Sequence, residues 1–310
     1  IPTRGWLRLV QRTAPMCPAI RLPFLGLGPT PALEAWEAQP QPLDIPGVPL
    51  SVSARELFDA NVLDIRTIIA DLQGASSEEV IALTLQALER TPESVPSLRA
   101  AMFQRLGWCH LNLGEEGAAE RFFRQAAELA EIGGHPGNIL GATCGRALIA
   151  WRHGRLHDAA TICRETLYSF VEPLERSGRR LPVAGDLYIY LGRILFELYE
   201  LEEAESMLTK GVELAELTMR SGDLLDGYHA LACLRCLEHD FEGAYAWMEA
   251  AERTCTLVPE GIRALWARIW LWRARVEKDH QPLDRALAWA RGRDVEHPAD
   301  DDWEVQRLAG

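Results

Sequence analysis

The sequence predicts an all-α protein in which helical hairpins repeat about every 40 residues. Two patterns predict this class: small residues recur at regular intervals where helices are expected to begin, and prolines concentrate at one end of the chain. A third observation is the composition, because 48% apolar and 25% charged residues are typical of a globular protein. A chain of 310 residues is also long enough to bury a sizeable core.

Residues 1–52 differ in composition from the rest of the chain. The first 50 residues hold ten of the 18 prolines. Proline removes an amide donor and interrupts a helix, so a long helix is excluded in this segment. We expect only two short helical pieces, over residues 6–12 and 32–38, in an otherwise extended and poorly ordered segment.

Residues 53–310 carry the repeat. Each expected hairpin has a turn followed by a residue, nearly always small, that lets the second helix pack closely. These residues lie 39, 40, 45, 40 and 42 positions apart: Val80, Ala119, Ala159, Ala204, Ala244 and Ala286. The pattern is typical of the tetratricopeptide repeat, whose period is about 34 residues. We therefore predict about six tetratricopeptide-like hairpins, each longer than usual, stacked into a right-handed superhelix.

The first helix of each hairpin is expected to line the concave face of such a superhelix. The repeat register places aromatic, arginine and carboxylate side chains there, and Arg268 of the last repeat is among them. Six residues form the candidate ligand-binding set: Trp151, Arg152, Arg193, Glu197, Asp226 and His229. Arg193 and Glu197, four apart on one helix, are expected to present a donor and an acceptor to a polar effector. An ordinary solvated helix face is the alternative.

Two further clusters invite a chemical interpretation. His229, Cys233 and Cys236 share a helix face and supply three of the four ligands that structural zinc needs. Buried cysteines also act as small apolar residues, and the sequence favours that packing role, with no metal and no cofactor. Trp266 and Trp270 lie one turn apart and stack on one face. They suit a sugar or a base, but filling the groove between repeats is the favoured interpretation.

Composition and motifs exclude several function classes. The net charge of −13 repels phosphate, so direct nucleic-acid binding by this segment is not expected. Phosphate-binding, dinucleotide-binding and hydrolase motifs are absent from the sequence, and an enzyme is not expected. The sequence holds no apolar run of about 18 residues, so no membrane association is expected. Seven scattered cysteines and the lack of a secretory leader favour reduced thiols and a cytoplasmic location.

The second half of the chain resembles a known family. Residues 190–205 (YLGRILFELYELEEAE) are similar to a segment of the large ATP-binding LuxR-type regulators, the MalT family. Residues 227–235 (GYHALACLR) resemble the segment that follows it, and the tryptophan-rich stretch ending at Ala290 continues the family's order. The likeness covers roughly residues 53–310. Residues 15–50 depart from it, because prolines stand where the family continues with repeat helices.

The resemblance implies a function. In that family the repeat superhelix lies between an ATP-binding module and a DNA-binding helix-turn-helix, and it is thought to sense the inducer and assist self-association. We therefore expect a non-enzymatic, effector-sensing fragment that lacks both flanking modules, with a small molecule or peptide in the concave groove. The alternative is a stand-alone tetratricopeptide scaffold that binds another protein. A zinc-dependent protein around Cys233 is a third possibility.

Overall fold

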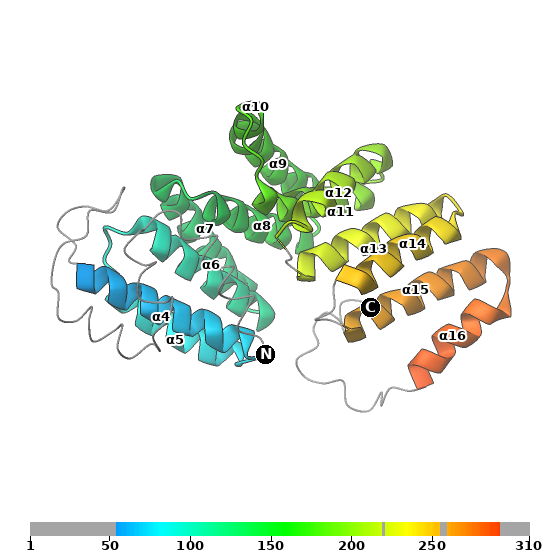
Figure 1. The fold of residues 1–310 in the computed structure, drawn as a ribbon, viewed down its shortest axis with the longest axis horizontal. Helices are drawn as coiled ribbons and strands as arrows, with labels where there is room; N and C mark the ends of the chain where they lie inside the picture. The colour runs from blue at the N-terminus through cyan, green and yellow to red at the C-terminus, as the bar shows by residue number, and fades with distance from the viewer. Residues whose placement is uncertain (1–53, 219–220, 255–258, 292–310) are drawn as a thin grey trace, which may run out of the picture.

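The computed structural model describes residues 54–218, 221–254 and 259–291, and within them every regular element is a helix. Six pairs of antiparallel helices follow one another in chain order and form an arch (Figure 1). The first helices of the six pairs are α4 (Ala54–Leu72), α6 (Pro96–Asn112), α8 (Pro136–Arg152), α11 (Gly185–Glu197), α13 (Ser221–Leu237) and α15 (Pro259–Glu277). The second helices are α5 (Ser77–Arg90), α7 (Glu116–Gly133), α9 (Leu156–Thr166), α12 (Leu201–Ala215), α14 (Phe241–Thr254) and α16 (His280–Arg291). The predicted all-α repeat architecture is confirmed.

The residues that marked the repeats in the sequence lie where the helices of each pair meet. All six positions, from Val80 to Ala286, are at most 4% exposed. Close packing is most evident at Gly192 on α11, where an added Cβ would lie 2.6 Å from Leu208 Cγ on α12. The hairpins therefore depend on small side chains at these contacts, as the repeat pattern predicted.

The third hairpin differs from the others in its second helix. Helix α9 continues without a break through a π-helical turn, η1 (Leu167–Val171), into α10 (Glu172–Arg176). A short 3₁₀ turn, η2 (Pro182–Ala184), then leads into α11. This extended helix projects from the top of the arch (Figure 1). A π-helical turn accommodates an extra residue within a helix. The extended helix and the connection over residues 177–184 together account for the interval of 45 residues in the sequence.

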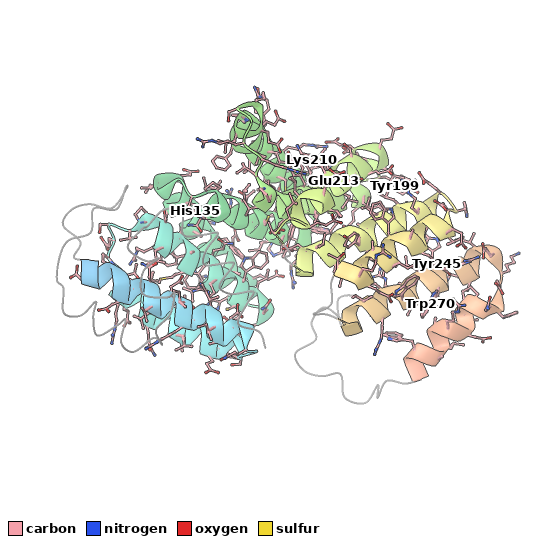
Figure 2. All side chains as sticks on the ribbon, viewed as in Figure 1. His135, Tyr199, Lys210, Glu213, Tyr245 and Trp270 are labelled. Atoms are coloured by element: carbon pink, nitrogen blue, oxygen red, sulfur yellow. The ribbon has the colours of Figure 1, made fainter. Side chains whose placement is uncertain are left out.

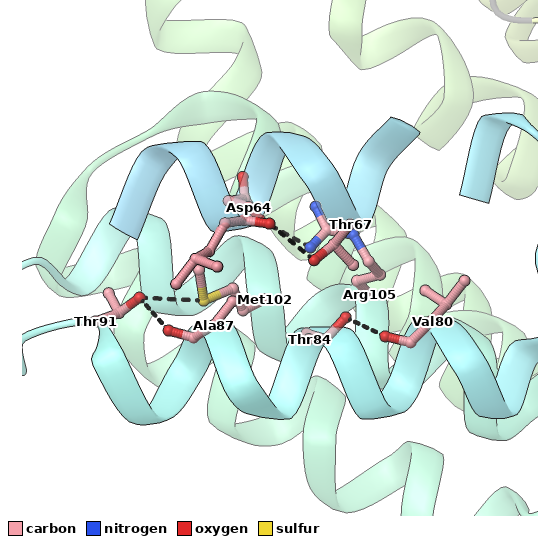
Figure 3. A network of polar contacts seen from close by, with 9 residues as sticks. Asp64, Thr67, Val80, Thr84, Ala87, Thr91, Met102 and Arg105 are labelled. Atoms are coloured by element: carbon pink, nitrogen blue, oxygen red, sulfur yellow. Dashed lines mark hydrogen bonds and ion pairs between the residues drawn. The ribbon is translucent and has the colours of Figure 1, made fainter. Parts of the chain in front are cut away.

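Hydrogen bonds satisfy the buried polar side chains of the first two hairpins, and one of them joins the hairpins (Figure 3). Arg105 Nη1 on α6 donates a hydrogen bond to Asp64 Oδ1 on α4 over 2.8 Å, and both side chains are largely buried. The hydroxyls of Thr84 and Thr91 each donate to a carbonyl oxygen four residues earlier, at 2.7 Å. These partners allow polar side chains to lie in the interior without an unsatisfied group.

The interior consists of two clusters of buried apolar residues. The first, here the N-terminal cluster, extends from Leu111 to Leu214 and draws most of its members from α8, α9 and α11. The second, the C-terminal cluster, extends from Ile189 to Ile269 and centres on α13 and α14. Phe196 on α11 packs against both clusters. Helices α11 and α12 therefore contribute to both halves of the arch.

Two further sequence predictions concern the proline-rich segment and the membrane. The proline-rich segment, residues 1–52, and its two expected short helices lie outside the described residues. Within the described ranges, none of the helices is both long and apolar enough to span a bilayer.

Candidate functional site

All six candidate ligand-binding residues line one groove. The groove has a volume of about 440 Å³ and lies on the side of the arch formed by the first helices of the hairpins. The end of α8, helix α11, helix α13 and helix α15 all contribute to it. Its lining consists of Leu148, Trp151, Arg152, Gly154, Leu156, Arg193, Phe196, Glu197, Asp226, His229, Ala230, Cys233 and Arg268. Pockets of this size accommodate small ligands.

Trp151 forms the centre of one wall. Its indole Nε1 donates a hydrogen bond to Glu197 Oε2 over 2.8 Å, and the guanidinium of Arg193 lies 4.7 Å from the centre of its ring. Arg193 and Glu197 were expected to present a donor and an acceptor to an effector. In the structure both contact the Trp151 side chain from the preceding hairpin. That they also present these groups to an effector stays a prediction.

Two charged pairs flank this wall. Arg193 donates a hydrogen bond to Asp226 across the groove, and only 14% and 19% of the two side chains are exposed. Arg152 Nε donates to Glu116 Oε1 over 2.6 Å, which ties α8 to the first turn of α7. This contact and the adjacent His153 lower the pKa of the Glu116 carboxyl, because a carboxylate that accepts hydrogen bonds is stabilised in its charged form. Arg152 is therefore held by a residue outside the groove lining.

His229 and Cys233 stand one turn apart on α13, and His229 Nε2 lies 3.4 Å from Cys233 Sγ. Burial raises the pKa of the Cys233 thiol to about 11, with the nearby Arg268 acting in the opposite direction. A thiol with this pKa is protonated at neutral pH and is not a nucleophile. Cys236 does not complete a three-ligand site, because the described residues contain no group of three His, Cys, Asp or Glu side chains placed to hold a metal.

Arg268 closes the groove at the α15 end. It was predicted to face the concave side but was not placed among the candidate ligand residues. Its side chain is exposed, and among the described residues it has no hydrogen-bond or ion-pair partner. Glu197 on α11 accepts the Trp151 hydrogen bond and likewise has no ion-pair partner among the described residues.

A second hollow, of about 630 Å³, lies between α14, α15 and α16 and contains the tryptophans noted in the sequence. Trp266 and Trp270 stack with ring centres 5.6 Å apart, and Tyr245 meets Trp266 edge-on at 5.2 Å. Trp266 Nε1 donates to Glu252 Oε1 over 2.8 Å. Tyr245 and Trp270 are labelled on α14 and α15 in Figure 2. The aromatic rings contact one another, which agrees with the packing interpretation.

The sequence interpretation missed some lining residues and one residue that binds a lining side chain. Leu148 and Leu156 form an apolar wall beside Trp151, and Glu116 holds Arg152 from another hairpin. The repeat register assigns faces within one helix but not the contacts between residues of different hairpins, which here lie 33 or more positions apart. Glu116 carried one usable signal, which is an acidic residue in the first turn of a helix that follows a predicted turn.

Fold and groove together define a helical-repeat solenoid of the tetratricopeptide type with a ligand-sized hollow on the face formed by its first helices. Residues 60–308 match the family described as the MalT-like TPR region, and the chain belongs to that family. A comparison with curated proteins gives no match.

Several solved structures are similar to this chain at low sequence identity. PilF of Pseudomonas aeruginosa is 14% identical with a TM-score of 0.51, over 82% of this chain and 98% of that one. BtubC of P. vanneervenii is 17% identical with a TM-score of 0.48, over 62% of this chain and 78% of that one. TPR-like repeats of a putative kinesin light chain from Podosopora anserina are 16% identical with a TM-score of 0.46, over 64% and 97%.

Proposed function

We propose that the chain is the effector-sensing repeat domain of a MalT-like, LuxR-family transcriptional regulator, acting in the cytoplasm without catalysis or a cofactor. One observation carries the sensing role: six residues selected from the repeat register alone line a single groove of about 440 Å³. Aromatic surface, apolar wall and opposite charges in one hollow are the features that small-ligand sites combine. Membership of the MalT-like TPR family supports the regulatory context.

The position of the groove suggests how binding is transmitted. Its lining comes from four consecutive hairpins, so a ligand in contact with all of them favours one curvature of the arch. A ligand shifts a conformational equilibrium by its difference in affinity for the two states. We propose that the favoured curvature promotes self-association of the regulator. Size-exclusion chromatography with light scattering, with and without ligand, tests this step.

A thermal-shift screen of the 310-residue chain against sugars, nucleotides, amino acids and peptides tests the sensing role. A ligand that binds only the native state raises the melting temperature by mass action. Calorimetry then compares the wild type with Glu197→Gln in the groove and Glu213→Gln as the matched control. Glu213 is exposed on α12, outside the groove lining (Figure 2). Weaker binding by Glu197→Gln alone supports the site, whereas equal binding by both variants removes it.

A stand-alone scaffold that binds a protein segment is the second candidate. The observation that favours it is the length of the groove, which crosses several helices as an extended polypeptide would require. The coding sequence on either side of this region distinguishes the two proposals. An ATPase upstream and a helix-turn-helix downstream support the regulator, and their absence supports the scaffold.

A further inference from the structure

The charges of the groove are arranged in a definite order from one end to the other. Arg193 and Asp226 neutralise each other between α11 and α13, and Glu116, outside the groove lining, neutralises Arg152. Glu197 on α11 and Arg268 on α15 remain, and neither has an ion-pair partner among the described residues. The part of the groove between α11 and α15 therefore has a negative end on α11 and a positive end on α15, separated by a neutral section on α13.

The separation of these two ends sets the length of a complementary ligand. Helix α13 packs against both α11 and α15, so two helix-to-helix spacings separate Glu197 from Arg268. Packed helices lie 8–10 Å apart, which places the two charged ends about 16–20 Å apart. An extended polypeptide advances about 3.3–3.6 Å per residue, so about five residues span this distance. A single amino acid is too short to reach both ends.

The section between the two ends suits the middle of such a chain. Phe196 on α11 and Ala230 and Cys233 on α13 supply aromatic and apolar surface for a side chain. The paired Arg193 and Asp226 offer donors and acceptors to backbone amides without adding net charge. Glu197 uses one carboxylate oxygen for Trp151, which leaves its other oxygen to accept a further hydrogen bond.

From this arrangement we infer that the effector is a short peptide of about five residues with free termini. Its ammonium group binds Glu197, and its carboxylate binds Arg268. The inference rests on the proposed sensing role and adds the chemical class and orientation of the ligand. A free α-amino group and a free α-carboxyl group are both charged near pH 7, so each finds an opposite charge in the groove.

Calorimetry on the 310-residue chain at low salt tests the inference with Gly-Ala-Phe-Ala-Gly as the probe. The peptide is used with free termini, with an acetylated amino end and with an amidated carboxyl end. Charge-assisted hydrogen bonds lead us to expect about tenfold weaker binding for each blocked form. A three-residue peptide with free termini is expected to bind as weakly as the blocked forms, because it cannot reach both ends.

Two substitutions test which residue of the groove binds each terminus of the peptide. Arg268→Gln is expected to weaken binding of the free peptide about tenfold and to leave binding of the amidated peptide unchanged. Glu197→Gln is expected to weaken binding of the free peptide about tenfold and to leave binding of the acetylated peptide unchanged. Arg275→Gln, exposed on the same helix two turns beyond Arg268, and Glu213→Gln serve as matched controls with unchanged affinity.

The outcomes separate this inference from the proposed function. Equal binding of free and blocked peptides, or equal loss by Arg268→Gln for the free and amidated forms, overturns the orientation. Stabilisation by another compound class with no pentapeptide binding overturns the peptide inference and leaves the sensing groove in place. Failure of every compound class in the thermal-shift screen removes the sensing role itself.

Discussion

The guanidinium of Arg193 on α11 donates a hydrogen bond to the carboxylate of Asp226 on α13, and this pair joins two successive hairpins at the middle of the groove. Both side chains are more than four-fifths buried. The same guanidinium lies over the ring of Trp151 from the preceding hairpin. One arginine thus contacts three hairpins, so it contributes to the stability of the arch as well as to the shape of the groove.

Replacement of Arg193 by alanine is expected to lower the free energy of unfolding by about 2 kcal/mol, because the largely buried Asp226 carboxylate loses its partner. Urea denaturation followed by circular dichroism measures the change. The double variant Arg193→Ala/Asp226→Ala is expected to lose less than the sum of the two single variants, since the pair acts as a unit. Strict additivity would show that the two side chains do not interact in solution.

The hairpin contact at Gly192 gives a packing prediction. Gly192→Ala places a methyl group 2.6 Å from Leu208 Cγ and 3.0 Å from the Leu208 backbone nitrogen. Overpacking of this kind is expected to lower the free energy of unfolding by about 1–3 kcal/mol.

Gly117→Ala is the matched control for this change. Gly117 lies in α7, and an added Cβ there has no neighbour within 4 Å. Alanine is the better helix former, so a gain of about 0.5 kcal/mol is expected. Thermal denaturation of the two variants side by side tests the pair. Equal effects at both sites would show that α11 and α12 separate more easily than the structure indicates.

Acid sensitivity is expected at the Arg152–Glu116 contact. The Glu116 pKa is lowered in the folded protein, chiefly by the hydrogen bond from Arg152. Because the folded-state pKa lies below the unfolded-state value, the contribution of Glu116 is complete above the unfolded-state pKa and is lost as the pH falls through the folded-state pKa. The difference in unfolding free energy between wild type and Glu116→Gln is therefore expected to be positive at pH 7 and to shrink below about pH 5.

Urea denaturation at several pH values between 7 and 3 measures that difference. Glu120→Gln, on the same helix and paired only with the exposed Arg124, is the control and is expected to change stability little at any pH. A Glu116→Gln difference that stays constant across this range would mean that the contact with Arg152 is not formed.

Thiol reactivity reports on the core. Burial raises the pKa of Cys163 and Cys236 to about 12 and that of Cys109 and Cys233 to about 11. These thiols are expected to stay protonated at pH 8 and to react with a disulfide reagent only after unfolding. The Cys17→Ser/Cys255→Ser variant removes the two cysteines that lie outside the described residues. Rapid labelling of this variant in its native state would show that the hairpins open readily.

The sequence was sufficient to predict the hairpins because small residues at helix contacts are a local requirement of close packing. Ala119, Ala159 and Ala204 mark the contacts in both the sequence and the structure. The groove followed from the same register, since the face of a helix repeats every 3.6 residues. Whether the six residues bind a ligand stays a prediction.

Contacts between hairpins could not be predicted in the same way. Trp151 and Glu197 lie 46 positions apart, and their hydrogen bond depends on how two hairpins rotate against each other. For the same reason the sequence did not predict that Arg193 and Glu197 contact Trp151. The long interval before Ala204 was visible in the sequence, but its length alone did not distinguish a longer loop from the π-helical extension after α9.

The groove is lined by residues of both apolar clusters, so it joins the two halves of the arch. Leu148 and Leu156 belong to the N-terminal cluster or pack against it, Ala230 and Cys233 belong to the C-terminal cluster, and Phe196 touches both. In a linear array of repeats, stability is the sum of unit and neighbour terms, so each half can open while the other stays folded. A molecule bound in the groove contacts both halves, so we expect it to make them unfold together as one cooperative unit.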